Sequence, residues 1–458
     1  MSTLSFVRIN ADAALDASGW HPGPLAAIVE IRPDVGPSLA PWPGTLPTPP
    51  ARGMISVRLL SPEQADAELR VYPSGIVRTI ERPSHVLMPG FVNAHTHLDL
   101  THLGPFPAGQ GSFGPFFARV REGRLTDADE ITGAVRLGIA RSLAGGVVAV
   151  GDIAGCPPGA GPSAAPFLAL AASPLLGVSY LEFFAIGTRE AESLDRLERV
   201  WDDLRTRAGG SPGMRLGLHP HAPYSVSLAG YARAVTLAAR DGAPLSTHVA
   251  ESPAEHELIA RAAGPSRAFL ESLGLWSDAL LADFGHGKTP VEHLQPVLAR
   301  SASLGVRPLL IHLNDLSGPD VSAVARYASV AYCPRSSSYF DTERAFGPHR
   351  YQDLLVGGGV PVCLGTDSIL NVAGPGLSPL DDARVLFRRD TLDPVTLAAM
   401  LTKNGADALG LDATQFRFGA DGRAAPLAGL VAVPTSPAAG PRGVFQSDAG
   451  PELLAIAR

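Results

Sequence analysis

The sequence predicts an α/β protein: a distorted (β/α)8 TIM barrel with a small β-sandwich domain formed by the N- and C-terminal segments. Eight short apolar runs end in polar or ionisable residues, helix-like segments separate them, and strand-like stretches without helices occupy both ends of the chain. Apolar strands that alternate with helices are typical of a parallel sheet buried on both faces, and eight of them favour a closed barrel. With 458 residues, 45% of them apolar, the chain can bury a sizeable core.

The first 87 residues differ from those that follow. Stretches such as AAIVEIRP, MISVRLL and ELRVYPSGIVRTI alternate apolar and polar residues between prolines and glycines, which is the pattern of short antiparallel strands. We therefore assign residues 1–87 to the N-terminal part of the small β-domain. The proline-rich stretch 34–50 is expected to be an exposed loop, and its role stays open.

The barrel is predicted over residues 88–410. Its strands are the runs VLMPGFVNAHTH, GVVAVGD, LLGVSYLEFF, MRLGLHPH, PLSTHVAE, RPLLIHLND, SVAYCPRSS and PVCLGTD. Their mean spacing is about 39 residues, against about 31 in a simple barrel of this kind, so insertions are expected. The longest insertion, residues 252–306, is expected to add a helix or a lid, and its role also stays open.

Helical periodicity supports this division. ADEITGAVRLGIARSLAGG carries apolar residues at 3.6-residue spacing and ends in a glycine pair, and DPVTLAAMLTKNGADALG begins with Asp393 as a cap before Pro394. Beyond about residue 410 the helical period is lost. We expect residues 411–458 to form the C-terminal part of the small β-domain, with strands that pair with those of the N-terminus.

Composition excludes several classes of partner. The 37 basic and 44 acidic residues give a net charge of −7, which argues against a nucleic-acid or anionic membrane surface. Three cysteines are too few for a disulfide framework or a thiolate zinc site, and neither a signal peptide nor an apolar membrane span of about 20 residues is evident. We expect a cytoplasmic protein with no nucleic-acid or membrane partner. A homo-oligomer is one of the states that the sequence leaves open.

Ionisable residues gather at the ends of the predicted strands, where the active site of such a barrel lies. They are His95, His97, Asp152, Glu182, His219, His221, His248, Glu251, His312 and Asp367. His95 and His97 point to the same side of their strand and can converge on one ion, and a third histidine with a carboxylate completes a set suited to zinc or iron(II). Alternatively each histidine bonds to backbone, which would explain one or two of them but not the ordered series.

The motifs PGFVNAHTHLDL, HPHAPYSVS, STHVAES, PVEHL, LLIHLND, YCPRSSSYF and CLGTDS, in this order, resemble those of the amidohydrolase superfamily. More narrowly they resemble its mononuclear deaminase and chlorohydrolase branch, which includes cytosine, guanine, S-adenosylhomocysteine and aminodeoxyfutalosine deaminases. The resemblance covers about residues 85–410. It implies metal ligands at the residues His95, His97, His248 and Asp367. It further implies a proton shuttle at Glu251 and a catalytic histidine at His312, with Asp367 also acting as a base.

The scarcity of lysine predicts the number of metal ions. Binuclear relatives bridge two metals with a carboxylated lysine at the end of strand 4, where this chain has His219-Pro220-His221. The two lysines of the chain, Lys288 and Lys403, are both distant from that position. We therefore expect one divalent metal per chain, unless a ligand other than lysine bridges two ions, with zinc as the first choice and iron(II) as the alternative.

The resemblance also suggests substrate-binding residues. His221 occupies a position that contacts the purine-like ring in adenosine-type relatives, and Asp99 in HTHLDL is the shorter homologue of the glutamate in HTHLE of aminodeoxyfutalosine deaminase-like enzymes. Arg121 lies on the segment that often closes over substrate. The alternatives are a histidine bonded to backbone for His221 and an exposed helix face for Arg121. Asp152 and Glu182 are expected to orient the ligating histidines.

These assignments predict a hydrolase of C–N bonds that deaminates an aminated N-heterocycle, with an adenine-type nucleoside such as aminodeoxyfutalosine favoured. A bound zinc ion lowers the pKa of its water from 15.7 to about 7, and Glu251 would carry a proton from that water to a ring nitrogen. A chlorohydrolase or another cyclic-amidine hydrolase would use nearly the same residues. A third alternative is an inactive, metal-containing binding protein, but the retention of Glu251 and His312 argues against it.

Overall fold

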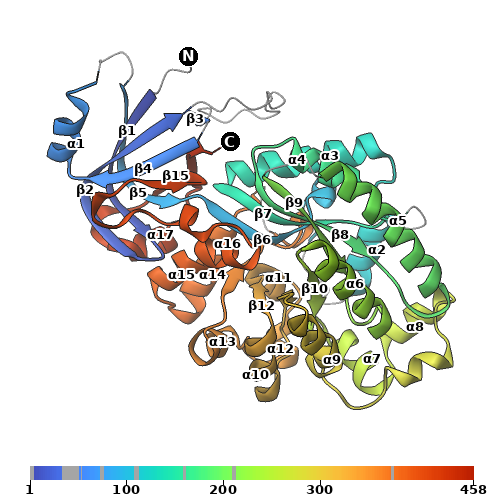
Figure 1. The fold of residues 1–458 in the computed structure, drawn as a ribbon. Coiled ribbons are helices and arrows are strands. Elements are labelled where there is room, and N and C mark those ends of the chain that lie inside the picture. The colour runs from blue at the N-terminus through green and yellow to red at the C-terminus, as the bar shows by residue number, and fades with distance from the viewer. Residues whose placement is uncertain are drawn as a thin grey trace.

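The computed structural model describes residues 5–32, 51–52, 54–72, 77–107, 113–157, 161–208, 213–372 and 376–457. A β-sheet built from both chain ends lies beside a larger α/β body (Figure 1). Within the described ranges, no helix is long and apolar enough to span a membrane. The predicted loop over 34–50 lies outside the described residues.

The terminal sheet interleaves strands from both ends of the chain. Its strands are β1 (Ser5–Asp16), β2 (Gly19–Arg32), β3 (Ala51–Arg52), β4 (Met54–Leu60), β5 (Val77–Pro89), β14 (Ala425–Leu427), β15 (Gly429–Pro434) and β16 (Glu452–Ile456). Their order is β14-β4-β2-β1-β5-β15-β16-β3, which confirms that the tail pairs with the N-terminal strands. Val57 of β4 and Leu454 of β16 belong to one apolar core although they lie far apart in this order, as expected of a sheet that folds over on itself.

One part of the expectation for this sheet is wrong. The N-terminal stretches do not form a purely antiparallel unit, because β1 pairs with β5 in parallel. Between β4 and β5 the chain passes through helix α1 (Pro62–Leu69), and a connection of this kind allows a strand to return in the same direction.

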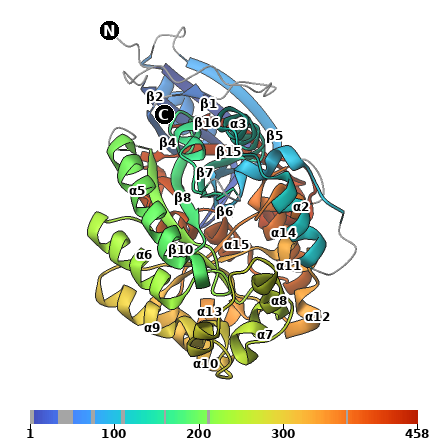
Figure 2. The same cartoon turned by 90° about the vertical axis from the view of Figure 1, so that its right-hand side faces the viewer.

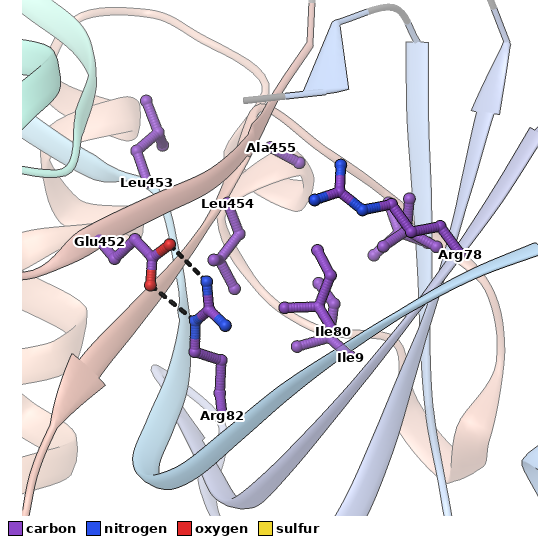
Figure 3. Close-up of a pocket in the computed structure, with 10 residues that line it drawn as sticks. Ile9, Arg78, Ile80, Arg82, Glu452, Leu453, Leu454 and Ala455 are labelled. Atoms are coloured by element: carbon purple, nitrogen blue, oxygen red, sulfur yellow. Dashed lines mark hydrogen bonds and ion pairs between the residues drawn. The ribbon is translucent and has the colours of Figure 1, made fainter. Parts of the chain in front are cut away.

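An ion pair links the last strand, β16, to β5 of the N-terminal region. Arg82 of β5 donates two hydrogen bonds of 2.6 Å, from Nε and Nη2, to the two carboxylate oxygens of Glu452 on β16 (Figure 3). The pair borders a small cavity of about 30 Å³ that is lined mainly by aliphatic side chains such as Ile9 and Ile80. This bidentate geometry fixes the register between two segments that lie 370 residues apart in the sequence.

All eight predicted barrel strands form. They are β6 (Phe91–Thr96), β7 (Val147–Ala154), β8 (Leu176–Phe183), β9 (Met214–Pro220), β10 (Ser246–Val249), β11 (Leu309–His312), β12 (Ser329–Tyr332) and β13 (Val362–Leu364). They make two parallel sheets, β6-β7-β8-β9 and β10-β11-β12-β13. Isolated bridges, Leu218 to Leu245 and Thr96 to Asp367, join the two sheets at both edges, so the barrel closes but is distorted, as predicted.

The first predicted run divides between the two regions. β5 ends at Pro89 and β6 begins at Phe91, so VLMP belongs to the terminal sheet and FVNAHT to the barrel. Gly90 lies between them, where a Cβ atom would come within 2.5 Å of the Val148 side chain. The domain boundaries at 87/88 and 410/411 stay predictions.

Helices surround the barrel strands, and Figure 2 shows several of them, among them α5, α6 and α9, on the outside. Their bounds are α2 (Phe113–Gly123), α3 (Ala128–Ala144), α4 (Ala165–Ala171), α5 (Glu190–Ala208), α6 (Leu228–Asp241), α7 (Pro253–Arg261), α8 (Pro265–Ser272), α9 (Pro290–Ser303), α10 (Gly318–Tyr327), α11 (Pro334–Tyr339), α12 (Thr342–Phe346), α13 (Tyr351–Gly358), α14 (Pro379–Asp390), α15 (Pro394–Leu401), α16 (Lys403–Ala408) and α17 (Gly443–Gln446). The helix expected after Asp393 is interrupted between α15 and α16, because Thr402 has φ −131° and ψ −92°. Asp393 caps α15 as predicted, accepting the N–H of Thr396.

The long insertion between β10 and β11 forms the helical elements α7, α8 and η4 (Asp278–Ala282) before α9. These elements have a small apolar core of their own, which includes Leu258, Leu270 and Phe284. Phe269 of α8 lies 6.5 Å from Phe117 of α2, measured between ring centroids. The insertion therefore contacts the helix that follows the first barrel strand.

Candidate active site

Three histidines and one aspartate meet at the carboxyl ends of the barrel strands. His95, His97 and His248 are buried, and their nearest ligand atoms all lie within 4.8 Å of one another. The Nε2 atoms of His95 and His97 each lie 3.6 Å from the same oxygen, Oδ1 of Asp367. The four residues that the motifs singled out as ligands thus come together, although they span about 270 positions of the sequence.

The backbone explains this convergence. His95 and His97 are two residues apart, so both side chains point to the same side. The chain after β13 crosses close to β6, where the backbone N–H groups of Thr366 and Asp367 donate to the carbonyl of His95 at 3.0 and 3.1 Å. Gly365 permits this approach, because a Cβ atom there would lie 2.8 Å from the Cβ of His95.

The donor set fits a divalent metal. Neither ring nitrogen of His95, nor Nδ1 of His97, has a hydrogen-bond partner among the described residues, although all three atoms are buried. Buried polar atoms normally have partners, and an ion would provide one. Two ligands at about 2.1 Å from a tetrahedral ion are about 3.4 Å apart, close to the 3.6 Å separations between Asp367 Oδ1 and the two Nε2 atoms. The chain therefore contains a histidine-rich site suited to a divalent cation.

The charges of these groups agree with this use. Burial, with further effects from neighbouring histidines, lowers the pKa of His97 and of His248, which keeps both imidazoles in the neutral, metal-binding form. Burial would raise the pKa of Asp367, but contact with His95 and the proximity of His312 lower it below its usual range. The aspartate is therefore ionised.

Two further residues reach the same centre. Glu251, His312 and Asp367 offer atoms within 4.8 Å of one another, and Oε1 of Glu251 lies 3.3 Å from Nε2 of His312. Burial, and next the nearby carboxyls of Asp367 and Glu255, raise the pKa of Glu251 well above its ordinary value. An acid with a raised pKa beside a metal-binding cluster is suited to proton transfer.

The backbone at these residues is strained. His312, Leu313 and Asp367 have φ angles of 75°, 57° and 57°, and such left-handed conformations cost free energy in residues other than glycine. The buried His349 holds the backbone at His312. It accepts the N–H of Tyr351 at Nδ1, 3.0 Å away, so its Nε2 carries the proton and donates to the carbonyl of His312 at 2.8 Å.

Glu251 is held by residues that the sequence analysis did not identify. The two carboxylate oxygens of Glu255 accept the N–H groups of Ala250 and Glu251, at 3.0 and 2.9 Å, and Asn314 donates to the carbonyl of Glu251 at 3.1 Å. Ser252, three residues before Glu255, caps α7, which is a recognisable sequence pattern for a helix start. That pattern could have located the helix, but not the two hydrogen bonds that Glu255 accepts from Ala250 and Glu251.

His221 lies beside the cluster, as expected of a residue near the substrate. Its ring centroid is 5.2 Å from that of His248, and its Nδ1 lies 2.7 Å from the hydroxyl oxygen of Ser225. Burial and the positive charge of Arg124 lower the pKa of His221 to about 3, so the ring is neutral. The ring of Phe184, 38% exposed, lies 4.6 Å from that of His221. His221 is bonded to a side chain rather than to backbone, and its role stays a prediction.

Asp99 belongs to a buried ion-pair cluster that contains a different arginine from the one we selected. Arg124 Nη1 donates to Asp99 at 2.8 Å, and its Nη2 donates to Glu182 at 3.2 Å. Arg121, by contrast, is exposed on α2. Burial raises the pKa of Asp99 to about 6, although Arg124 opposes the shift. The substrate-binding roles of Asp99 and Arg121 stay predictions, and Arg124 is the residue that sequence reasoning missed.

The two remaining carboxylates, Asp152 and Glu182, do not hydrogen-bond to the rings of the ligating histidines, contrary to expectation. Glu182 pairs with Arg124 and also accepts the N–H of Cys156 at 3.0 Å. Asp152 accepts the N–H of Leu98 at 2.9 Å, so it holds the backbone just after His97. Asp152 therefore supports the site by holding the backbone next to His97, and Glu182 supports it by pairing with the charge of Arg124.

The end of β9 has histidines where a bridging lysine would lie. His219 places Nδ1 2.8 Å from Oγ of Ser246 and Nε2 3.2 Å from Nδ1 of His248. Lys288 is exposed in the long insertion, and Lys403 pairs with Asp407 on α16. Neither lysine is at the barrel mouth.

Sequence comparison identifies similar proteins. The model of the amidohydrolase family matches residues 86–427. The chain is 31% identical to the aminodeoxyfutalosine deaminase of Deinococcus radiodurans, over 72% of this chain and 75% of that protein. It is 26% identical to the 5-methylthioadenosine/S-adenosylhomocysteine deaminase of Syntrophomonas wolfei, over 72% of this chain and 70% of that protein.

Solved structures share the fold at lower sequence identity. The Helicobacter pylori aminofutalosine deaminase in complex with methylthio-coformycin superposes with a TM-score of 0.70 at 18% identity, covering 98% of each chain. The guanine deaminase of E. coli gives a TM-score of 0.65 at 16% identity, covering 94% of this chain and 89% of that one. The predicted fold class is thereby confirmed.

Proposed function

The chain belongs to the amidohydrolase family, as its motif order predicted, and we propose that it deaminates an adenine-type nucleoside by hydrolysis. The observation that carries the proposal is the placement of Glu251 and His312, 3.3 Å apart, beside the three clustered histidines and Asp367. Among such nucleosides aminodeoxyfutalosine is favoured. Its support is the 31% identity to a named aminodeoxyfutalosine deaminase, together with the acid at Asp99.

The proposal includes one divalent metal per chain, with zinc as the first choice and iron(II) as the alternative. His95, His97, His248 and Asp367 would hold it, since their free ligand atoms face one another. When bound, such an ion polarises substrate and lowers the pKa of water. The absence of a lysine at the end of β9 supports a single ion.

The remaining chemistry belongs to side chains of this protein. Glu251 takes a proton from the attacking water and delivers it to the ring nitrogen next to the amine-bearing carbon. His312, held at 3.3 Å from Glu251, orients the attacking oxygen. Asp367 accepts the second proton of the water and passes it to the leaving amine, which departs as ammonia. The Ser336 hydroxyl donates to the other Asp367 oxygen at 2.7 Å and so fixes the carboxylate for this task.

Recognition of the base is proposed for His221, whose neutral ring can bond to a heterocycle nitrogen. Phe184 presents a partly exposed aromatic ring 4.6 Å from that of His221 and would pack against the planar base. Asp99, two residues after His97, is proposed to contact a polar group of the sugar or its substituent.

Ammonia and chloride release, measured in parallel, test the proposal. Purified zinc-loaded protein is incubated with aminodeoxyfutalosine, methylthioadenosine, S-adenosylhomocysteine, guanine and a chlorotriazine. We expect one ammonia per adenine-type nucleoside consumed, fastest with aminodeoxyfutalosine. Chloride release from the triazine without ammonia from any nucleoside would instead identify a chlorohydrolase. No turnover of any compound would favour a binding protein.

The proposal places the enzyme in the cytoplasm, acting on a small molecule without nucleic-acid or membrane partners. The three cysteines are free thiols in the structure, two of them buried, which suits a reducing compartment. Whether the chain forms a homo-oligomer is measured directly by light scattering of the purified protein.

A further inference from the structure

His219 forms a bridge between two residues of the neighbouring strand. Its side chain is fully buried at the end of β9. Nδ1 lies 2.8 Å from the Ser246 hydroxyl oxygen, and Nε2 lies 3.2 Å from Nδ1 of His248. The two imidazole rings are nearly perpendicular, at 82°, with centroids 4.6 Å apart. Both ring nitrogens of His219 are therefore engaged by β10.

The strand geometry produces this bridge. Ser246 and His248 are two residues apart on β10, so their side chains project on the same side. β9 and β10 are joined by the bridge between Leu218 and Leu245, which places His219 opposite this pair. The N–H of His248 also donates to the carbonyl of His221 at 3.0 Å, which fixes the relative position of the two strand ends.

The direction of these hydrogen bonds follows from the role of His248. Because Nδ1 of His248 faces His219, Nε2 is the nitrogen left for a metal. A neutral imidazole that binds a metal through Nε2 carries its proton on Nδ1, so His248 donates to Nε2 of His219. His219 then carries its own proton on Nδ1 and donates to Ser246. The opposite direction would put the proton of His248 on Nε2 and block the metal.

We propose that His219 is a positioning residue that holds His248 in its metal-binding tautomer and orientation, through the chain from His248 to His219 to Ser246. This inference rests on the proposed metal site. Ligating histidines generally donate their second N–H to a carboxylate, a carbonyl or water. Here a neutral imidazole is the acceptor, so the ligand is oriented without an added negative charge.

The other two histidine ligands differ in this respect. Nδ1 of His95 and Nδ1 of His97 have no hydrogen-bond partner among the described residues. Among the three histidine ligands, His248 is thus the one whose second ring nitrogen has a defined side-chain partner. Loss of such a contact typically weakens metal affinity 10- to 100-fold.

Zinc affinity, measured by competition with a chromophoric chelator, tests this inference without reference to turnover. His219→Leu removes the acceptor, and His219→Gln retains one at a similar reach. His293→Leu is the matched control, because His293 is equally buried, on α9, and lies outside the site. We expect the dissociation constant to rise about 10- to 100-fold in His219→Leu, to return most of the way in His219→Gln, and to stay unchanged in His293→Leu.

The absorption spectrum of the cobalt(II)-loaded protein adds a spectroscopic readout, expected to shift in His219→Leu and not in the control. Ser246→Ala keeps both imidazoles and removes only the end of the chain, so a smaller rise in the dissociation constant is expected; it also serves if His219→Leu fails to fold. Wild-type affinity in His219→Leu, or in Ser246→Ala where only that variant folds, would overturn the inference. A wild-type protein that binds no zinc would instead overturn the proposed metal site.

Discussion

The two halves of the barrel contribute to the site in different ways. The first half, β6 to β9, has strands of 6 to 8 residues and supplies His95 from within β6 and His97 from the position directly after it. The second half, β10 to β13, has strands of only 3 or 4 residues and supplies His248, Glu251, His312 and Asp367 at or just beyond their ends.

Backbone conformation separates the halves as clearly. Ala250, His312, Leu313 and Asp367 all have positive φ angles, whereas between residues 91 and 245 no described residue other than glycine does. Strand periodicity alone can converge two ligands. The residues proposed to move protons lie at short, strained strand ends, and neighbours such as Glu255 and His349 hold them. Strain of this kind is typical of functional sites.

The largest effect on activity is expected from variants that test whether both halves of the barrel bind one ion. His97→Ala in the first half and Asp367→Ala in the second should each lower kcat/KM at least about 10³-fold, because a metal contributes several kcal/mol and each 1.36 kcal/mol is a factor of ten. Zinc content by elemental analysis should fall in both variants. If either variant retains full activity, the half of the barrel that supplies the changed residue does not contribute to metal binding.

Glu251→Gln should separate proton transfer from metal binding within the second half. We expect kcat to fall about 10²- to 10⁴-fold, because general acid–base catalysis contributes that factor, while zinc content stays at the wild-type level. Steady-state kinetics with the best substrate and elemental analysis measure the two quantities. Unaltered kcat would show that Glu251 is not the shuttle.

In the first half, charge pairing rather than strain is expected to matter most. Arg124→Gln leaves Asp99 and Glu182 buried without their cation and should lower the free energy of unfolding by about 3 to 5 kcal/mol. The matched change Arg121→Gln, on the exposed face of α2, should stay within about 0.5 kcal/mol of wild type. Denaturant titrations compare the two, and equal effects would contradict the distinction between these arginines.

Glu255→Gln should loosen Glu251 without removing it. One of the two acceptor oxygens becomes an amide nitrogen, so the turn from Ala250 to Glu251 loses a hydrogen bond. We expect kcat to fall about 10- to 100-fold, the cost of a small misplacement, with zinc content unchanged. If kcat of this variant equals that of wild type, the strained turn is not held by Glu255.

The smallest expected effect concerns pH. Burial raises the pKa of Glu255 from 4.5 to about 7, although hydrogen bonds from the backbone oppose it. The folded state therefore binds this proton more tightly than the unfolded state, and the contribution of Glu255 to stability falls as pH rises from 4.5 to 7. The stability deficit of Glu255→Gln relative to wild type should shrink over this window. Denaturant titrations at pH 5 and 7.5 measure the difference, and a deficit that grows would reverse the sign.

The sequence predicted the parts of the site that depend on local pattern. Strand ends with ionisable residues located β6 to β13, and the two-residue spacing explained why His95 and His97 converge. Arg124 was missed because it follows the end of α2 at Gly123, where helical periodicity no longer gives its direction. His349 was missed because its contact with His312 depends on how separate segments pack, and no local pattern encodes that contact.

The most direct test of the central claim is an anomalous diffraction map of the zinc-loaded protein, recorded at the zinc absorption edge. The account predicts one peak per chain at the barrel mouth, bounded by His95, His97, His248 and Asp367. Two peaks there, or a single peak elsewhere, would contradict it.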